Sequence, residues 1–311
     1  MTIDVIIPNY NGSGLVKKNL PQVLTQVKKY NANIIIADDH SKFEDFEELS
    51  KFIKELQDKR EKVVLQRNEK NLGFSSTVNK GVAASKADFI VLLNTDVYPE
   101  KDFLDAALAD FIQDENLFGV GLMDKSIEDN DTVLRGRGLA SWQKGFLLHK
   151  RGEVDKTDTF WVSGGSSVIR RELFVKLGGL DTLYDPFYWE DIDLSYRAKK
   201  SGYELKFEFK SVVEHRHEEG AIKKYYSSSK VKTIAYRNQF IFVWKNISDP
   251  SLILSHLVWF PYHVVSAFLR LDAPFILGFI CAIVRLPLII NKRYIQAKFY
   301  KKRDRDLFNN Q

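Results

Sequence analysis

The chain has 311 residues, of which 44% are hydrophobic and 28% are charged, a composition typical of a folded protein. The formal net charge of +5 is modest, so its distribution matters more than its size, and we expect no nucleic-acid partner. The single cysteine, Cys281, excludes an internal disulfide and a cysteine-based metal cluster. Because the sequence enters an apolar run at once, without the segments of a signal peptide, we expect a cytoplasmic protein.

Apolar runs alternate with helical patterns over the first hundred residues. The runs predict strands at 3–7, 34–37, 63–65 and 89–93, and the patterns predict helices at 15–29, 44–59 and 75–85. This alternation predicts an α/β fold with a mostly parallel central sheet and helices on both faces. Ligands of such sheets bind beyond the carboxyl ends of the strands, where the polar clusters of this sequence lie.

The loops after the first two strands carry side chains that suit a nucleotide. Pro8 and Tyr10 follow the first strand, where the tyrosine ring can stack on a base. Asp39 follows the second strand and can accept the N3–H of a uracil or thymine ring. The alternative interpretation is a pair of plain turns, with Asp38 as a structural capping group and His40 on the surface.

Two later loops suit a backbone approach and a divalent metal. Asn71 and Gly73 precede a helix, and glycine lets the backbone come close to a ligand, although an asparagine-capped helix start explains the pattern as well. Asn94 and Asp96, in Asn-Thr-Asp, end the fourth strand. They offer the hard oxygen ligands through which Mg²⁺ or Mn²⁺ bridges a diphosphate.

The acid-rich run that follows Trp189 is the most informative feature of the chain. Glu190, Asp191 and Asp193 fall within four positions, directly after an aromatic cluster. Carboxylates beside aromatic rings are partly desolvated, which raises their pKa and makes them better general bases. The alternative is an ordinary helix start, where acids are favoured by the helix dipole. We expect Asp193 to pair with Arg197 one turn later.

Two further motifs complete the candidate residues. Gly164 and Gly165 lie in Trp-Val-Ser-Gly-Gly-Ser-Ser, where small residues leave room for a sugar or allow a strand to pack against the sheet. His215 and His217 follow the acidic run and can each offer a neutral ring nitrogen to a metal ion.

These motifs, in this order over roughly residues 2–220, resemble those of inverting family-2 glycosyltransferases, which have the GT-A fold. The resemblance implies that the loop of Pro8 and Tyr10 forms a wall of the nucleotide pocket and that Asp39 reads the base. It places Asn71 and Gly73 beside the nucleotide. It also implies that Asp96, with Asn94 second to it, holds Mg²⁺ or Mn²⁺; the family usually has Asp where this chain has Asn94, which lowers the negative charge available.

The resemblance also assigns the transfer site. Asp191 matches the catalytic base that deprotonates the acceptor hydroxyl, and Glu190 orients the acceptor. Gly164, Gly165 and Trp189 line the donor-sugar and acceptor site. His215 is the expected further metal ligand, with His217 as the alternative.

The implied function is inverting transfer of a sugar from a UDP- or dTDP-linked donor to a hydroxyl of a glycan or polyprenyl-linked glycan, in bacterial surface polysaccharide assembly. The aromatic Asp-Pro-Phe-Tyr-Trp-Glu-Asp run and the Asn-x-Asp variant look similar to bacterial rhamnosyltransferase-like members. Two alternatives stay open. One is a nucleotidyltransferase on a related scaffold, although residues 8–17 give no tight phosphate-loop match. The other is a non-catalytic, membrane-bound sugar-binding scaffold.

The composition changes after about residue 225, which predicts two domains, a catalytic domain over 1–225 and a helical region over 226–311. Residues 251–269 and 273–284 contain no Lys, Arg, Asp or Glu, and each is near or below the length that spans a bilayer. We expect these helices to lie in the inner face of the cell membrane, with seven basic residues between Lys292 and Arg305 meeting anionic lipids. A buried helical hairpin that caps the catalytic domain is the alternative.

Overall fold

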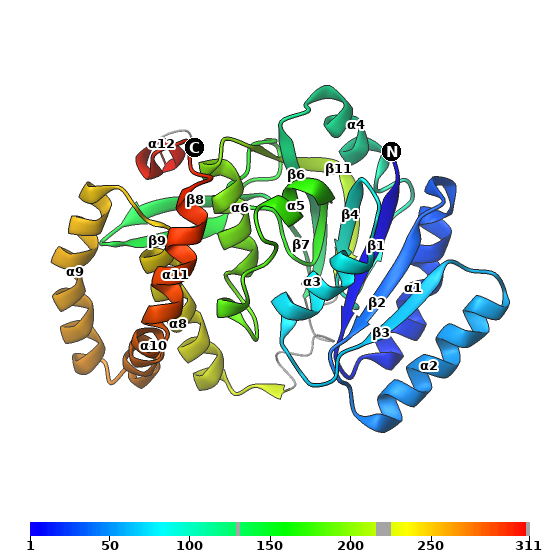
Figure 1. The fold of residues 1–311 in the computed structure, drawn as a ribbon, viewed down its shortest axis with the longest axis horizontal. Helices are drawn as coiled ribbons and strands as arrows, with labels where there is room; N and C mark the ends of the chain where they lie inside the picture. Colours follow the sequence, from blue (N-terminus) through cyan, green and yellow to red (C-terminus); the bar gives the residue numbers. More distant parts are fainter. Residues whose placement is uncertain (129–130, 216–224, 309–311) are drawn as a thin grey trace.

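The computed structural model describes residues 1–128, 131–215 and 225–308. Its first half confirms the predicted alternation (Figure 1). The strands are β1 (Ile3–Asn9), β2 (Asn33–Asp38), β3 (Val63–Arg67) and β4 (Phe89–Leu93), and the helices are α1 (Ser13–Val27), α2 (Phe43–Asp58) and α3 (Phe74–Ala84). A 3₁₀ turn, η1 (Lys28–Tyr30), continues α1, so the predicted helix and its observed end agree closely.

The central sheet has the strand order β3-β2-β1-β4-β10-β6-β11-β5, with β7 paired to β6. The added strands are β5 (Val97–Pro99), β6 (Leu117–Glu128), β7 (Asp131–Arg135), β10 (Ser166–Arg170) and β11 (Glu204–His215). The strands β1 to β4 pair in parallel, and β6 and β11 are parallel to each other, whereas β10 pairs antiparallel with both β4 and β6. The sheet is therefore mixed but mostly parallel.

Alternate residues of the strands face two separate cores. On β1, Val5 and Ile7 pack with α1, α2 and α4 (Asp105–Gln113), whereas Ile6 packs with α3 and α5 (Arg171–Lys176) on the other face. The mostly apolar composition of β1, β2 and β4 follows from burial on both faces. Helices thus cover both faces, and the α/β prediction is confirmed.

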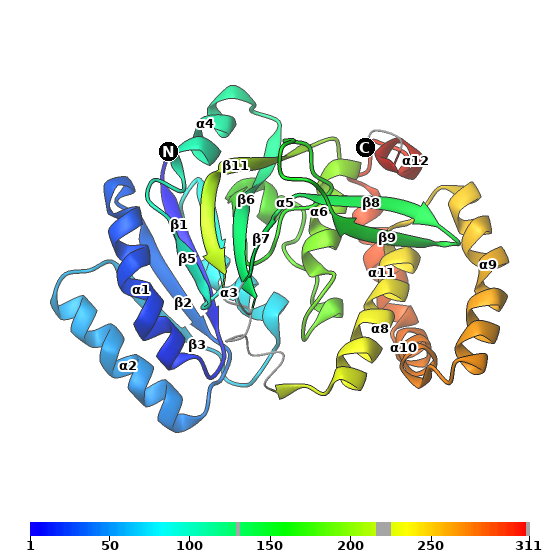
Figure 2. The same ribbon diagram turned by 180° about the vertical axis from the view of Figure 1, so that it is seen from behind.

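A third core forms around the C-terminal helices. It joins the hairpin β8 (Gly138–Gln143) and β9 (Phe146–Arg151), the turn η2 (Thr182–Tyr184) and the acidic helix α6 (Glu190–Lys200) to the C-terminal region. That region consists of α8 (Ser228–Asn246), α9 (Pro250–Leu269), α10 (Ala273–Val284), α11 (Leu286–Ala297) and α12 (Asp304–Phe308). In Figure 2 the hairpin reaches across to α9, where Trp142 donates to Ser255 Oγ at 3.2 Å. The predicted boundary between 1–225 and 226–311 stays a prediction, and this core crosses it.

The final helix is tied to α6 through one carboxylate. Asp304 is fully buried and forms an ion pair with Lys200 at 2.5 Å. It also accepts the backbone N–H groups of Ser248 and Asp249, each at 2.6 Å, and the hydroxyl of Tyr196. The end of the described chain therefore supports both the acidic helix and the start of α9.

The C-terminal helices leave a broad apolar surface exposed at the end of the molecule opposite α1 and α2 (Figure 1). By length and composition, α9 is the one helix among the described residues that could cross a membrane alone. Only 11% of its most apolar 18-residue stretch is buried. The helices α10 and α11 are long and apolar enough to cross a membrane only if they are counted as one segment, and they are bent by 65° relative to each other.

Candidate active site

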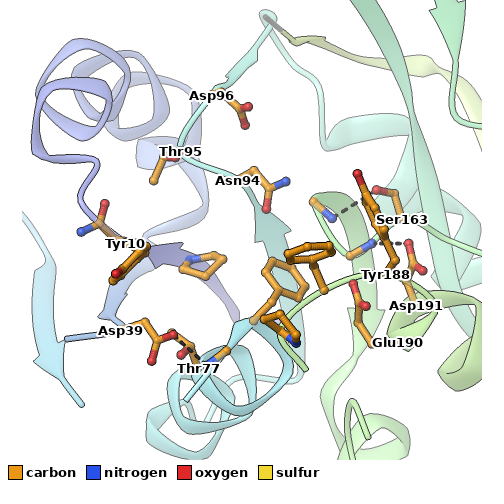
Figure 3. Close-up of a pocket in the computed structure, with 18 of the residues that line it drawn as sticks. Tyr10, Asp39, Thr77, Asn94, Thr95, Asp96, Ser163, Tyr188, Glu190 and Asp191 are labelled. Carbon is orange, nitrogen blue, oxygen red and sulfur yellow. Dashed lines mark hydrogen bonds between the residues drawn. The ribbon is translucent and has the colours of Figure 1, made fainter. Parts of the chain in front are cut away.

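A pocket of about 590 Å³ opens at the carboxyl ends of the parallel strands (Figure 3). Such a volume suits a ligand of the size of a nucleotide sugar. Twelve of the thirteen residues predicted for the site line it: Pro8, Tyr10, Asp39, Asn71, Gly73, Asn94, Asp96, Gly164, Gly165, Glu190, Asp191 and His215. The roles assigned to them stay predictions, but the fold brings them to one cavity.

Asp39 stands at one end of the pocket, fixed by three donors. Its Oδ1 accepts the N–H of Leu72 at 2.7 Å and the side-chain amide of Asn68 at 2.9 Å, and its Oδ2 accepts the N–H of Gly73 at 2.8 Å. Gly73 has a φ of +92°, and a Cβ there would lie 2.7 Å from Cγ of Asp185. Only glycine fits this turn, which holds the carboxylate of Asp39 at the pocket wall.

Asp38 has the structural role that the sequence left open. It is fully buried and accepts the side-chain amide of Asn9 at 2.9 Å and the N–H of Ser41 at 3.0 Å. It ties the loop after β1 to the loop after β2. His40 is exposed, as expected.

Aromatic rings surround the same end of the pocket. The ring of Tyr10 meets that of Tyr225 edge to face, with centroids 5.7 Å apart. Tyr226 also lines the cavity, and its ring lies 4.8 Å from that of Phe187. Flat rings on several sides favour stacking of a planar base.

Asp96 and His215 face each other at a second position of the pocket. His215 Nε2 lies 3.3 Å from Asp96 Oδ1, and its Nδ1 lies 2.9 Å from Asp124 Oδ2. Burial alone would lower the pKa of His215, but the hydrogen bonds to Asp124 and Asp96 outweigh it and raise the pKa to about 9. His217 lies outside the described residues.

The donor set at this position fits a divalent ion. A metal-binding histidine usually has its second ring nitrogen held by a carboxylate, and Asp124 does this for His215. No group of three or more His, Cys, Asp or Glu side chains able to hold a metal occurs among the described residues. Asp96 and His215 would therefore hold an ion together with oxygen atoms of a bound diphosphate.

Asn94 and the double glycine lie against each other between these two positions and α6. The N–H of Asn94 donates to the carbonyl of Gly165 at 3.0 Å, and a Cβ at Gly165 would overlap the side-chain amide of Asn94. A Cβ at Gly164 would press on Phe74 at 3.2 Å. The two glycines therefore keep the centre of the pocket free of side chains.

Asp191 and Glu190 open the first turn of α6 at the far end of the pocket. Asp191 Oδ2 accepts the N–H of Gly164 at 3.3 Å, and Oδ1 accepts the N–H of Ile192 at 2.8 Å. Burial raises the pKa of Asp191, and the backbone N–H groups partly offset this. Burial, with the charge of Asp191, raises the pKa of Glu190 well above its usual range. Among the described residues no group donates to Glu190 Oε2, although this atom is buried.

Asp193 points away from the pocket into a buried ionic network. It binds Arg197 at 2.8 Å, which confirms the expected pairing one turn later. Lys245 of α8 lies 2.7 Å from both Asp193 and Asp181, and Asn246 donates to Asp193 at 2.7 Å. This network holds the acidic helix against α8.

Trp189 is the predicted site residue that does not line the pocket. It is buried, and its ring packs 5.3 Å from that of Phe242 on α8. Its neighbour Tyr188 lines the cavity instead and is 42% exposed. Both residues have positive φ angles, 70° for Tyr188 and 77° for Trp189, in the turn that leads into α6. A role for Trp189 in substrate binding stays a prediction.

Several residues at the site had not been predicted. Asn68 directly follows β3, so the rule that polar residues at strand ends form the site could have found it. Asp124 lies inside β6 and gives no local signal. Arg135 and Thr77 line the pocket from β7 and α3, where nothing in the sequence marks them.

Comparison with known proteins gives the fold and the family. GalNAc-T7, solved with UDP, GalNAc and Mn²⁺, is similar with a TM-score of 0.64 at 19% identity, over 79% of this chain and 48% of that one. S. aureus TarS 1–349, solved with UDP-GlcNAc, gives a TM-score of 0.60 at 15% identity, over 99% of this chain and 91% of that one. The fold is therefore that of the GT-A transferases, as predicted.

The family assignment comes from the sequence. The profile of Glycosyl transferase family 2 matches residues 4–178, and the chain belongs to this family. The hyaluronan synthase of Pasteurella multocida is 21% identical over an alignment of 231 residues, and the match covers 64% of this chain. The chain spans about a quarter of that relative, 23% of its length.

Proposed function

We propose that this chain transfers a sugar, with inversion, from a UDP- or dTDP-linked donor to a hydroxyl of a glycan or polyprenyl-linked glycan, in bacterial surface polysaccharide assembly. One observation carries the proposal. A desolvated carboxylate, Asp191, opens onto the same pocket as the nucleotide-side Asp39 and the pair Asp96 and His215. A single-displacement sugar transfer needs a general base, a site for the diphosphate and a group that recognises the nucleobase, and this cavity offers a candidate for each.

The residues have the following roles in the proposed reaction. Tyr10 and Asp39 bind the nucleotide base, and Asp96 and His215 hold Mg²⁺ or Mn²⁺, which supplies positive charge to the leaving diphosphate. The acceptor hydroxyl gives its proton to Asp191 as its oxygen bonds to the anomeric carbon. The bond from that carbon to the diphosphate oxygen breaks on the opposite face, and the nucleoside diphosphate leaves. The transition state is oxocarbenium-like.

Glu190 has a separate part in this scheme. Burial and the charge of Asp191 raise its pKa well above the usual range, which favours the protonated carboxyl, and a protonated carboxyl can donate as well as accept a hydrogen bond. Glu190 lines the cavity, and its buried Oε2 has no hydrogen-bond partner among the described residues. We assign it the orientation of the acceptor, because it lines the pocket directly beside Asp191 and its Oε2 is available for a further hydrogen bond.

The experiment is a donor panel. Purified protein is incubated with UDP-, GDP- and dTDP-sugars, dTDP-rhamnose among them, in Mn²⁺ or Mg²⁺, and hydrolysis and transfer are measured. We expect turnover of a UDP- or dTDP-sugar, and NMR of the product should give the inverted anomeric configuration. Absence of turnover for every donor would contradict the proposal. In a parallel reaction with a nucleoside triphosphate and a sugar phosphate, release of pyrophosphate would indicate a nucleotidyltransferase. Donor binding without turnover would indicate a scaffold.

We also propose that the protein is a peripheral protein on the inner face of the cell membrane. The support is the exposed apolar surface of the C-terminal helices, which includes Leu254, Leu257, Val258, Val265, Phe268 and Leu269 of α9. Apolar patches of this extent on a monomer mark an interaction site. An anionic bilayer is the partner that suits both this surface and a lipid-linked acceptor.

The basic tail supports this proposal less than the sequence suggested. Arg305 forms a two-pronged pair with Asp249, at 2.7 and 3.0 Å, and Lys302 binds Glu204 at 2.9 Å. Lys292 lies 3.5 Å from Asp181, and Arg293 donates to the carbonyl of Trp244 at 2.8 Å. These four of the seven basic residues have internal partners, so we assign the main part of membrane binding to the apolar helices.

A further inference from the structure

Residues 184–189, here called the bridging segment, connect the two ends of the pocket. Near its start, Asp185 accepts the N–H of Ser75 at 2.8 Å and the hydroxyl of Ser76 at 2.7 Å, which fixes it to the first turn of α3 on the nucleotide side. At its end the chain enters α6 at Glu190. The conformation of this segment therefore sets the position of the base relative to the nucleotide end.

The bridging segment contains two consecutive residues in the left-handed region. Tyr188 and Trp189 have φ angles of 70° and 77°, and the side chains of both are large. Residues of this kind rarely adopt positive φ, and they keep it only where the surroundings impose it. Something outside the segment must therefore hold this turn.

The side chain of Asn238, on α8, holds this turn in place. It is fully buried, and its Nδ2 lies within hydrogen-bond distance of the carbonyl oxygens of Tyr184 at 3.0 Å, Phe187 at 2.9 Å and Tyr188 at 2.8 Å, so its two N–H groups are shared among three acceptors. Three carbonyl groups that converge on one amide nitrogen specify the path of the backbone between them. An aspartate or alanine at this position could make none of these bonds.

Arg237, the preceding residue, fixes the same amide and adds two bonds of its own. Its Nε donates to Asn238 Oδ1 at 2.8 Å, which orients the amide so that its NH₂ group faces the carbonyl groups. Its guanidinium also donates to the carbonyl oxygens of Tyr184 at 3.1 Å and Asp185 at 2.7 Å. Neither Arg237 nor Asn238 is among the residues that line the pocket.

We propose that Arg237 and Asn238 are positioning residues for the transfer reaction. They hold the left-handed turn that presents Tyr188 to the pocket and places Asp191 at the first turn of α6. Because the acceptor hydroxyl must meet the base within a narrow range of distance and angle, a small displacement of this turn lowers the rate of transfer. The expected change in kcat rests on the proposed function, whereas the expected effect on the conformation of the bridging segment does not.

The kinetic experiment compares Asn238→Ala with Gln239→Ala. Gln239 is the next residue of α8 and loses one bond of similar kind, to the carbonyl of Leu147 at 3.2 Å, away from the bridging segment. We expect Asn238→Ala to lower kcat roughly 10- to 100-fold while the Kd of the preferred nucleoside diphosphate, measured with Mn²⁺, stays within about twofold. Gln239→Ala should leave both unchanged. An unchanged kcat, or a loss of nucleotide binding equal to the loss of kcat, overturns the inference.

A second measurement does not need turnover. Hydrogen–deuterium exchange of the full-length protein should become faster across 184–189 in Asn238→Ala, while the last turns of α6, residues 194–200, keep their protection. Arg237→Gln serves if Asn238→Ala does not fold, and it should give the same local pattern. Faster exchange throughout α6, or none in the bridging segment, overturns the inference. If the wild type transfers no sugar at all, the proposed function fails. The exchange pattern still tests whether Arg237 and Asn238 fix the conformation of the bridging segment.

Discussion

Asp191 has the contacts of a carboxylate that is held in place and left basic. Its two hydrogen bonds come from backbone N–H groups, and the one from Gly164 is long, at 3.3 Å. Burial raises its pKa, whereas the neighbouring Asp193, which binds Lys245 and Arg197, has a lowered pKa because these charges outweigh burial. Two acids two residues apart thus have opposite roles, one catalytic in our proposal and one structural.

Substitution of Asp191 by Asn keeps the shape of the side chain and removes the proton acceptor. We expect kcat to fall by at least about 10²-fold, the lower range for loss of a general base. The Kd of the donor should change little, because the base contacts the acceptor. Kinetics with the preferred donor and calorimetric titration of the donor check this. Transfer near the wild-type rate would show that another group is the base.

The raised pKa of Asp191 also predicts the pH dependence of the reaction. Below that pKa the base is protonated and cannot accept the proton of the acceptor, so the rate falls as the pH falls. The acidic limb of kcat/KM should therefore lie above 3.8, the ordinary pKa of an aspartate. A pH profile of the wild type measures this limb, and the residual activity of Asp191→Asn should lack it. A limb that persists in the variant belongs to another group, such as Glu190.

The pair of Asp96 and His215 predicts coupled loss of metal and donor. Asp96→Ala should weaken the binding of Mn²⁺ and of the donor together, because a metal ion held by Asp96 would supply positive charge to the diphosphate. His215→Ala should have a milder effect, since Asp96 remains, and Asp124→Asn should act in the same direction through the orientation of His215. Titration of Mn²⁺ with and without nucleoside diphosphate checks this. Full activity of the wild type in excess EDTA would exclude a metal from the reaction.

At the scale of elements, the acidic helix depends on a buried ionic network that spans α6 and α8. Lys245 is completely buried between Asp181 and Asp193. Lys245→Met removes the cation that Asp181 and Asp193 share. Among the described residues it leaves Asp193 in an ion pair only with Arg197, and Asp181 only with the more distant Lys292. It should lower the free energy of unfolding by about 3–5 kcal/mol. Urea unfolding of the full-length chain measures this.

The matched control for this prediction is Lys17→Met. Lys17 pairs with Glu48 at the same distance, 2.7 Å, but both side chains are largely exposed. Solvent screens such a pair, so the control should change stability much less. If the two variants lost equal stability, burial of the ion pair would not be the cause.

The sequence predicted these elements unevenly, for physical reasons. The strands β1 to β4 and the helices between them were predictable because apolar runs and helical periods are local signals. The insertion of β10 between β4 and β6 depends on strand pairing across the chain, and no local pattern gives it. Tyr188 rather than Trp189 lines the pocket, and both have positive φ angles in a turn whose carbonyl groups contact α8, about fifty residues later, so no local pattern predicts this arrangement.

At the scale of the molecule, the catalytic sheet and the exposed apolar helices form a single body. Lys245 and Asn246 of α8 contact Asp193, and Asp304 of α12 contacts Lys200, so the C-terminal helices support α6 from two sides. A chain that ends near residue 245 would leave Lys200 without its carboxylate. Membrane binding must therefore be tested by substitution on the exposed surface of the complete chain.

We expect the full-length protein to float with anionic liposomes and to resist release by high salt, because apolar contacts dominate. Leu254→Ser, Leu257→Ser and Val258→Ser together should lower the bound fraction by more than about tenfold. The control changes Phe43, Ile112 and Val175 to Ser, three residues of similar exposure on other faces. A wild type that stays soluble at low salt contradicts membrane docking. If the wild type forms a dimer that the α9 substitutions abolish, a second copy of the chain, and not a membrane, covers this surface.

The contact between Asp304 and Lys200 has a consequence for the order in which the protein is completed during synthesis. The segment that carries Asp191 leaves the ribosome well before Asp304, and until then Lys200 lacks the carboxylate that compensates its burial. The helices α8 to α11 are made in that interval. We therefore expect the apolar helices to be available for lipid before the acidic helix reaches its final stability. If the protein docks on the membrane as we propose, a nascent chain would reach the lipid surface before Asp304 is made, and the acidic helix would gain this ion pair only after α12 has been made.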